Sequence, residues 1–408
     1  MSLYSTVRRC KHKLDHGFKI GAKNVIRPLR ASSTIGGLLR LPRNEVVSVF
    51  DPPAQSQTQF ESIEVHPSEE RHRELPTFLN GSPHWRYKEN QSSSCPASYA
   101  HRLENVYLWG HYGGNVFTKE RNIIEELSPN VWGISLHDAF KKFRFPRPKH
   151  IKGKTLSLIT KEAPSNYWHW MIDLLPKIKV VLDAGFDLNS FDNILIKWNQ
   201  TRYQKETLET LGVDLSKLIE VAETDYIQLD ELVCPTFKTG QYECPGWAIQ
   251  WLRNSIKPSE PSNDPGQYIF LSRENCDFRR LTNESEIFDK LEPLGFKKLM
   301  PDRLSVAEQA HIYSKAKMII GPHGAAFTNS IFCNPETVLY EMLSPDYVDM
   351  SFWVTTQDLD LQHYIHLSSS EESSKQSYKN ARRQDFEISA DQVASSAQSA
   401  IQDVVNQR

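Results

Sequence analysis

The sequence predicts an α/β protein built on parallel β-sheets, and three observations lead to this class. Short apolar strands alternate with amphipathic helices from about residue 150 onward, as they do in successive βα units. A segment with three prolines and one glycine, KPSEPSNDPG at 257–266, interrupts this alternation and predicts a domain boundary. The 408 residues include 39% hydrophobic residues, which is enough for two cores. We therefore expect two α/β domains, of which the second is Rossmann-like.

The first 98 residues (1–98) predict little regular structure. Residues 1–30 hold eight Lys or Arg side chains and one acid, Asp15, which favours either a solvated basic arm or contact with an anionic membrane surface. Residues 51–98 are rich in Pro, Ser, Gln and charge and lack periodicity. We expect irregular structure or a long connection there.

Residues 99–256 are expected to form the first α/β domain. Short strands and turns follow from Tyr107, and regular alternation begins with the strand TLSLIT. The predicted strands are 155–160, 193–198, 218–221 and 226–235, and the predicted helices are 165–185, 203–212 and 246–256. Pro176 lies within the first of these helices and is expected to kink or split it.

Residues 257–367 are expected to form the second domain. The predicted strands are 268–273, 296–300, 317–321 and 337–342, and the predicted helices are 283–295, 304–316 and 325–332. Residues 368–408 complete the chain as a polar linker and an amphipathic helix over 388–405.

Composition excludes several classes of function. The chain carries 48 basic and 50 acidic residues, a formal net charge of -2, whereas a dedicated nucleic-acid binder shows a strong basic excess. Six cysteines without a CxxC pair predict neither a disulfide scaffold nor a structural zinc site. The N-terminus lacks the apolar core of a secretory signal, and no stretch approaches the roughly 20 apolar residues of a membrane-spanning helix. We therefore expect a cytoplasmic protein. Its basic arm could bind the inner face of a membrane.

A loop in the second half is a candidate anion site. The strand at 317–321 runs into Pro322-His323-Gly324-Ala325-Ala326, and a helix follows. Open α/β sheets bind ligands beyond the carboxyl ends of their strands, and a helix N-terminus presents free N–H groups to an anion. Small residues would let a phosphate approach the backbone, and His323 could donate a hydrogen bond to it. The alternative is an ordinary turn in which His323 caps the helix.

Further candidates stand at the ends of neighbouring strands. Ser272 and Arg273 end the first strand of the second half, and Arg279 and Arg280 follow in the next loop. An arginine in this place could hold phosphate by a bidentate contact; the alternative is a surface salt bridge to a nearby acid. Glu341 ends a later strand, where a carboxylate could bind ribose hydroxyls or could stand solvated at the strand end.

A helix in the first half carries a second group of candidates, the run NYWHW at 166–170 followed by Asp173. His169 and Asp173 are four residues apart and share one helix face, so either could act as a general base that faces a cleft. The aromatic neighbours could stack on sugar rings or exclude water; they are Tyr167, Trp168 and Trp170. The alternative is an aromatic cluster packed in the core, with a hydrogen bond between His169 and Asp173.

Motifs of other enzyme classes are absent. The sequence contains no GxGxxG, no GxxxxGK, no HExxH and no GxSxG. The nearest approach to the DxD triplet of metal-dependent sugar transfer is Asp358 and Asp360, which we interpret as surface residues.

Four segments together resemble glycosyltransferase family 61: NYWHWMIDLLPKI at 166–178, 268–284, LSVAEQAHIYSKAKMIIGPHGAAFTN at 304–329, and VLYEM at 338–342. The resemblance covers about residues 150–345 in this order. It implies a GT-B architecture, in which two Rossmann-like domains face each other across a cleft. It also implies inverting transfer from a nucleotide-activated sugar, usually UDP-linked, with no essential metal and no other cofactor.

The resemblance also implies roles for individual residues. It assigns the diphosphate region to Ser272, Arg273 and Arg280, and the β-phosphate with the leaving group to His323, Gly324 and Ala325. Asn329 would support that loop, and Glu341 would bind ribose. The acceptor side would comprise Asn166, Tyr167 and Trp170, with Asp173 as the general base and His169 beside it. Ala326 departs from the family, which often has a larger residue there.

The expected function is that of an inverting glycosyltransferase that builds a surface polysaccharide on a glycan or lipid-linked acceptor. A rival from another class is a non-catalytic scaffold that binds nucleotides or glycans in a polysaccharide assembly. It would keep the anion loop but would not need Asp173. A Rossmann-type oxidoreductase is a second rival, against which the missing GxGxxG counts.

Overall fold

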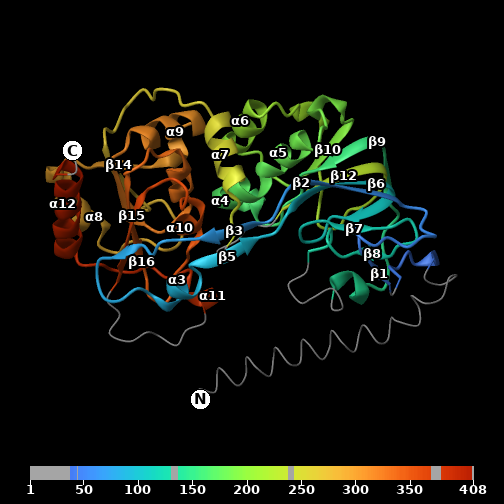
Figure 1. Cartoon of the computed structure of the whole chain (residues 1–408), viewed down its shortest axis with the longest axis horizontal. Helices are drawn as coiled ribbons and strands as arrows, with labels where there is room; N and C mark the ends of the chain where they lie inside the picture. Colours follow the sequence, from blue (N-terminus) through green and yellow to red (C-terminus); the bar gives the residue numbers. More distant parts are fainter. Residues whose placement is uncertain (1–36, 44, 130–136, 238–242, 369–377, 407–408) are drawn as a thin grey trace, which may run out of the picture.

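The computed structural model describes residues 37–43, 45–129, 137–237, 243–368 and 378–406, which form two large β-sheets side by side (Figure 1). The predicted α/β class with parallel sheets is therefore confirmed. The basic residues 1–30 and much of the polar segment 368–384 lie outside the described ranges. Among the described residues, no helix combines enough length and apolar character to cross a bilayer.

The first sheet has nine strands in the order β1-β8-β7-β6-β12-β9-β10-β11, and β2 pairs with β6 beside this path. The strands are β1 (Val46–Val47), β2 (Gln59–His66), β6 (Ser98–Trp109), β7 (Asn115–Phe117), β8 (Ile123–Ile124), β9 (Lys149–Ser157), β10 (Asn193–Ile196), β11 (Leu218–Glu220) and β12 (Tyr226–Thr236). The sheet is mixed, since β6 is antiparallel to β2, β7 and β12, whereas β12, β9, β10 and β11 run parallel.

The helical segment at 165–185 is divided into three pieces. They are α4 (Tyr167–His169), a π-helical turn (Trp170–Leu174) and α5 (Pro176–Asp183). The Leu175 N–H donates to the Trp170 carbonyl, five residues back, at 3.1 Å. Pro176 has no N–H and stands at the first position of α5, where the helix needs none. The prediction that Pro176 splits the helix is confirmed.

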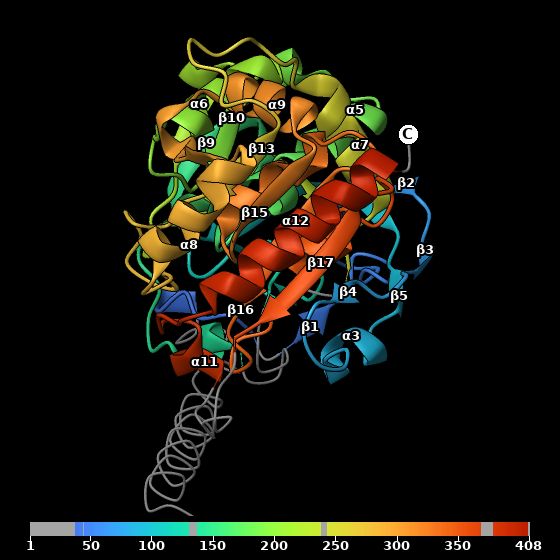
Figure 2. The same cartoon turned by 90° about the vertical axis from the view of Figure 1, so that its left-hand side faces the viewer.

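The second sheet is parallel throughout, in the order β14-β13-β15-β16-β17-β4. Its strands are β4 (Thr77–Phe78), β13 (Tyr268–Leu271), β14 (Lys297–Leu299), β15 (Met318–Pro322), β16 (Val338–Leu343) and β17 (Gln362–Leu367). The helices around the two sheets include α6 (Arg202–Thr210), α7 (Gly246–Ser255), α8 (Glu284–Leu291), α9 (Val306–Lys315), the 3₁₀ helix η9 (Ala325–Phe332), α10 (Ser351–Thr355), α11 (Tyr378–Ala381) and α12 (Ala390–Asn406). Figure 2 shows α12 lying across one face of this sheet, where Val393 and Ala397 pack with α8 and the strands.

The prediction of irregular structure over 51–98 is wrong. Two strands of this region join the two large sheets, β2 on the first and β4 on the second. Between them, β3 (Glu69–His72) pairs with β5 (Ser92–Cys95), and Tyr87 of α3 (Trp85–Glu89) is fully buried. Sequences such as EERH and SSSC have no apolar alternation to reveal a strand. They become strands by pairing their backbones with each other, whereas β2 and β4 pair with strands that later parts of the chain supply.

The largest cluster of buried side chains extends across both halves of the molecule. Trp168 and Ile249 of the first half belong to it together with Leu271, Ile319 and Phe327 of the second. The segment 257–266 runs over the surface with most of its side chains exposed. The two halves therefore meet on an apolar surface that is continuous with their cores.

Candidate functional site

The candidate site lies where β13 and β15 end, at the carboxyl edge of the second sheet. β15 ends at Pro322, and His323 follows with a nearly buried side chain. The His323 N–H donates to the Met342 carbonyl at 2.9 Å, which fixes the loop to β16. The imidazole packs against Phe352, at 4.9 Å between ring centroids, and against Tyr347, at 5.7 Å. The histidine is thus held by its surroundings before any ligand binds.

A buried carboxylate stands behind His323. Glu341, in β16, accepts hydrogen bonds from Nδ1 of His323 and, at 3.0 Å, from Nε2 of His363 in β17. Burial acts to raise the pKa of Glu341, but the charges and hydrogen bonds of the two histidines outweigh it and lower the pKa to about 2. Both carboxylate oxygens are therefore engaged inside the protein. The ribose contact that the resemblance implies for Glu341 does not fit this placement.

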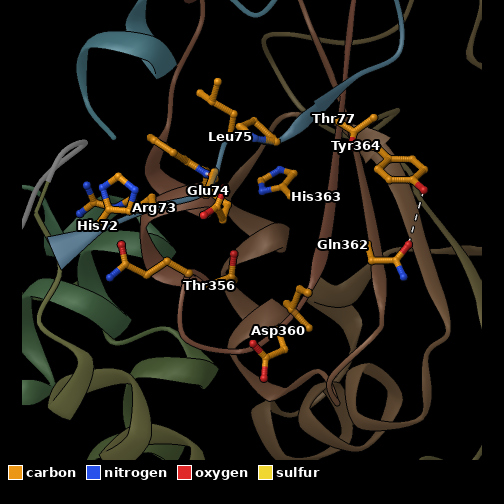
Figure 3. Close-up of a pocket in the computed structure, with 14 residues that line it drawn as sticks. His72, Arg73, Glu74, Leu75, Thr77, Thr356, Asp360, Gln362, His363 and Tyr364 are labelled. Carbon is orange, nitrogen blue, oxygen red and sulfur yellow. Dashed lines mark hydrogen bonds between the residues drawn. The ribbon is translucent and has the colours of Figure 1, made fainter. Parts of the chain in front are cut away.

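His363 separates Glu341 from a cavity of about 460 Å³ (Figure 3). The cavity lies between the β3–β4 connection and the start of β17, and Glu74, Thr356 and Gln362 surround the imidazole there. The Nδ1 atom of His363 is buried and has no hydrogen-bond partner among the described residues. The chain His323–Glu341–His363 thus connects the carboxyl edge of the sheet with this cavity.

Arg273 reaches the same loop from β13. Its Nη2 donates to the Phe278 carbonyl at 2.8 Å and its Nε to the Arg279 carbonyl at 3.2 Å. Its Nη1 lies so close to Gly324 that a Cβ atom on Gly324 would overlap it. Glycine is required there because any side chain would overlap the Arg273 guanidinium. The backbone conformation of Gly324 does not require glycine, since it is extended and any residue could adopt it. Burial lowers the pKa of Arg273, and the side chain forms no ion pair with the described residues.

The neighbouring candidates Ser272 and Arg280 are engaged elsewhere. The Ser272 hydroxyl donates to the buried carboxylate of Glu284, which also accepts the Arg273 N–H at 3.1 Å. Arg280 pairs with Asp385, with Nη2–Oδ2 at 2.7 Å and Nε–Oδ2 at 3.0 Å. Ser272 therefore shapes the loop, and Arg280 anchors the C-terminal segment.

Arg279, for which the resemblance implies no role, lies over Tyr347, the ring that packs on His323. Its guanidinium carbon lies 5.1 Å from the ring centroid of Tyr347, and Tyr347 packs on His323. Nη1 donates to the Arg382 carbonyl at 3.0 Å, whereas Nε is buried without a partner among the described residues. Arg279 has a φ of 56°, in the left-handed region. Because of this turn, the side chain of Arg279 packs on Tyr347 and the side chain of Arg280 pairs with Asp385. The sequence does not indicate which of the two arginines takes which position.

The first half meets this loop through α4. The Tyr167 hydroxyl donates to Asn329 Oδ1 at 2.7 Å, and Asn329 Nδ2 donates to Gln309 Oε1 at 2.6 Å. Asn329 is buried and Tyr167 is half-buried, and the burial of its hydroxyl group raises the pKa of Tyr167. α4 therefore packs on η9. Ala325, at the start of η9, remains partly exposed.

The pair His169–Asp173 is the part of α4 and its π turn that remains accessible. Nδ1 of His169 lies 2.6 Å from Oδ2 of Asp173, and both side chains are partly exposed. Asn166 caps α4, since its side chain accepts from the N–H groups of Trp168 at 2.9 Å and His169 at 3.3 Å. The π turn keeps Asp173 and His169 on one side of the segment.

Trp170 lies apart from the other aromatic candidates. It is fully buried, and its Nε1 donates to Thr207 Oγ1 at 2.9 Å. The contact with an acceptor that the resemblance implies for Trp170 does not fit a side chain buried in the core.

The two sides of the site also have a neighbour in common. Glu162 precedes α4, and its pKa is lowered by a hydrogen bond from Lys161 and by the charges of His169 and Arg382. Arg382 accepts from Arg279 through its carbonyl. The segment around Arg382 therefore neighbours both the arginine loop and the His169 pair.

A family comparison can now be set beside this geometry. The model of the family Glycosyltransferase 61 matches residues 167–340, from α4 to β16. Residues 167–340 belong to glycosyltransferase family 61. This family region contains α4, the arginine loop and the His323 loop, whereas Glu341, Tyr347 and His363 follow it along the chain. No curated protein matches the chain significantly.

The family region indicates a glycosyltransferase, which in general uses a nucleotide-sugar donor and a glycan acceptor. His323, Gly324, Arg273 and Arg279 gather on the second sheet. His169 and Asp173 stand on the first half, beside η9. Among the described residues, no three His, Cys, Asp or Glu side chains form a group that could hold a metal ion.

Proposed function

We propose that this chain transfers a sugar, with inversion, from a nucleoside-diphosphate sugar to a hydroxyl acceptor. The observation that carries the proposal is the close approach of Arg273 Nη1 to Gly324, beside His323, within the family 61 region. Among the described residues the Arg273 guanidinium has no carboxylate partner, and it lies at the end of the sheet, where Gly324 has no side chain. This is the place in an open α/β sheet at which a diphosphate binds.

The donor side can stabilise the leaving group electrostatically. When the bond between the anomeric carbon and the diphosphate oxygen breaks, negative charge grows on that oxygen. Arg273 and Arg279 supply fixed positive charge nearby. Nδ1 of His323 is hydrogen-bonded to Glu341, so Nε2 is the nitrogen left for the diphosphate, to which it donates when the imidazole carries both protons. These groups could perform the role that a metal ion has in other transferases, and we propose metal-independent transfer.

The acceptor side can supply the base. Asp173 would take the proton of the acceptor hydroxyl while the hydroxyl oxygen attacks the anomeric carbon from the face opposite the diphosphate. The hydrogen bond from His169 orients the carboxylate for this step. The reaction moves one proton from the acceptor hydroxyl to Asp173, forms one C–O bond and releases the nucleoside diphosphate. The anomeric configuration inverts.

Several finer features belong to the same proposal. We propose UDP as the nucleotide, a surface polysaccharide as the product and closure of two domains of GT-B type over the substrates. The two α/β layers that meet beside α4 and η9 support such an arrangement. A cytoplasmic location with peripheral membrane contact rests on the basic residues 1–30, which lie outside the described part of the chain.

The test is titration of the purified protein with UDP, followed by incubation with UDP-sugars and acceptor extracts. Arg273→Ala should weaken UDP binding by roughly tenfold to a hundredfold, because a charge-assisted contact is lost. Arg202→Ala, an exposed arginine on α6, is the matched control and should bind UDP like the wild type. Absence of binding to any nucleotide or nucleotide sugar would refute the proposal.

Asp173→Asn separates a transferase from a non-catalytic scaffold. For a transferase, this variant should still bind UDP but should lose transfer by roughly two orders of magnitude or more, because the base is lost. If the wild type binds UDP but transfers to no acceptor, and Asp173→Asn behaves identically, the scaffold function is the better description.

A further inference from the structure

A second cavity lies at the far end of the first sheet from the candidate site. It has a volume of about 360 Å³ and is bounded by the segment before β1, the β7–β8 hairpin and the buried Tyr226 of β12. β1, β7 and β8 lie on the opposite side of the molecule from the second sheet (Figure 1). This cavity is therefore separate from the Arg273 loop.

Four cationic side chains from two distant segments converge on this cavity. Arg40 and Arg43 come from the segment before β1, and Lys119 and Arg121 come from the β7–β8 hairpin. A backbone hydrogen bond of 2.9 Å, from the Arg43 N–H to the Arg121 carbonyl, joins the two segments. The convergence is therefore built into the fold.

Three of the four cations in this cavity are not paired with a carboxylate of the described residues. Arg40, Arg43 and Lys119 form no ion pair with the carboxylates of the described residues. Arg40 Nη1 donates instead to the Phe145 carbonyl at 3.4 Å. Arg102, on the same sheet, shows the contrast, since it pairs with Glu231, Glu104 and Glu61. Like charges in one cavity repel one another unless an anion joins them.

The single carboxylate in the cavity wall is already engaged. Glu120 accepts from the Gln57 N–H at 2.6 Å and from the Ser56 hydroxyl at 3.2 Å. Burial acts to raise the pKa of Glu120, but these hydrogen bonds outweigh it and lower the pKa. Glu120 therefore fixes the connection before β2, and the cavity keeps an excess of positive charge.

The backbone supports the same interpretation. Arg40 has a φ of 57° and Arg121 a φ of 72°, both in the left-handed region that a residue with a Cβ atom adopts at an energetic cost. Such strained residues cluster at ligand sites, where the surrounding structure holds them in place. Arg121 Nη1 donates to the Gly37 carbonyl at 3.3 Å, which anchors its guanidinium at the cavity.

We propose that this cavity is a second anion site, which binds a phosphate or diphosphate group independently of the sugar donor. Guanidinium groups and an ammonium group match the oxygens of a phosphate in charge and in hydrogen bonding. A soluble phosphate ester and the headgroup of a phosphorylated lipid offer this same chemistry.

The test is calorimetric titration with inorganic pyrophosphate at low salt. Saturating UDP is present, so that the donor loop is occupied. The double variant Arg43→Gln, Lys119→Gln should bind pyrophosphate at least about tenfold more weakly than the wild type. The control removes two exposed lysines elsewhere, Lys205→Gln and Lys257→Gln, and should bind like the wild type. If UDP does not bind, the same titrations with pyrophosphate are made in the Arg273→Ala protein, in which the donor loop is disabled. Pyrophosphate binding at the second cavity can then be measured even if the proposed function is wrong.

The outcome decides the proposal and then the source of the phosphate. Absence of pyrophosphate binding, or equal weakening in the double variant and the control, overturns it. Binding that weakens with added salt and is lost in the double variant alone supports it. Sedimentation with phosphatidylcholine vesicles, with and without phosphatidylglycerol, then distinguishes the sources. Vesicle binding that pyrophosphate displaces assigns the site to a lipid headgroup, and its absence assigns it to a soluble phosphate ester.

Discussion

At the scale of single residues, three close contacts define the proposed donor side: Arg273 on Gly324, Arg279 on Tyr347, and Glu341 between two histidines. Each places a charged group where burial makes its interactions strong. Together they predict how donor binding and acid stability respond to single substitutions.

Gly324→Ala should weaken UDP binding by roughly tenfold, because the new methyl group must displace the Arg273 guanidinium. The same substitution in an Arg273→Ala background should have little further effect on the dissociation constant, since the overlapping group is gone. Titration calorimetry of the wild type, the two single variants and the double variant measures this coupling. Additive losses would show that Gly324 acts independently of Arg273.

Arg279→Ala should weaken UDP binding more than Arg280→Ala does. Arg279 lies over the ring of Tyr347, which packs on His323, whereas the charge of Arg280 is already paired with Asp385. We expect a loss of roughly tenfold for Arg279→Ala and less than threefold for Arg280→Ala. The dissociation constants for UDP decide the matter, and the reverse order would contradict the placement of the two side chains.

Glu341 should contribute to the loss of stability in acid. Its folded pKa, about 2, lies below its ordinary value, so its contribution is complete above about pH 4.5 and is lost as the pH falls toward 2. Glu341→Gln should therefore be less stable than the wild type at pH 6 by a few kcal/mol, a difference that narrows across this window. Urea unfolding at several pH values measures it. Glu209→Gln, on an exposed face of α6, should show no such narrowing.

At the scale of elements, the pairing of α4 with η9 joins the first half to the donor loop. The π turn and Pro176 end α4 after one turn, so Tyr167 points to Asn329 while His169 and Asp173 remain accessible. A short helix with a buried polar bond at one side and a His–Asp pair at the other can position a base relative to the donor.

Tyr167→Phe should destabilise the protein by about 1–2 kcal/mol, because it leaves the buried Asn329 Oδ1 without its donor. It should also lower the transfer rate while UDP binding changes little, since α4 would hold its base less firmly. Urea unfolding and steady-state kinetics measure the two effects. Tyr99→Phe, which removes a surface bond to Glu64, is the control and should change both by little.

At the scale of the whole molecule, one apolar cluster extends through both halves, and strands from the N-terminal region join each sheet. Folding of the second sheet therefore depends on residues that lie nearly 200 positions before β13. The segment 257–266 separates the predicted domains along the sequence, but the cluster joins them in space.

The chain should unfold in a single cooperative transition, which differential scanning calorimetry would show. Tyr87→Ala, in α3, should shift the whole transition to lower temperature. The lost aromatic ring is fully buried and contacts Trp353 and Phe78, and we expect a loss of about 3–5 kcal/mol. Trp85→Ala, at an exposed neighbour, should leave the transition near its original temperature. Two separate transitions, of which Tyr87→Ala shifts only one, would contradict a shared core.

Apolar periodicity predicted most strands and helices from residue 155 onward, because those elements bury one face and the chain must alternate to do so. The strand β17 and the short helix α10 were not predicted, and β9 begins at Lys149, before the predicted start at 155. The loop after β15 was also predictable, since its strand, small residues and helix follow one another along the sequence. The strands β2 to β5 were not predicted, because their short or polar segments carry no clear apolar pattern. β3 and β5 become ordered by pairing with each other, and β2 and β4 by pairing with β6 and β17.

The sequence alone determined that an α/β chain carries His323 and Gly324 after a strand, Arg273 after another, and His169 four residues before Asp173. Only the tertiary structure decided which charges remain available. In the folded protein, Arg280 pairs with Asp385, and both carboxylate oxygens of Glu341 accept hydrogen bonds from histidines. Trp170 lies in the core, and Arg279 packs on Tyr347. The physical reason is that partners for buried charges and rings come from distant segments, and local spacing carries no record of them.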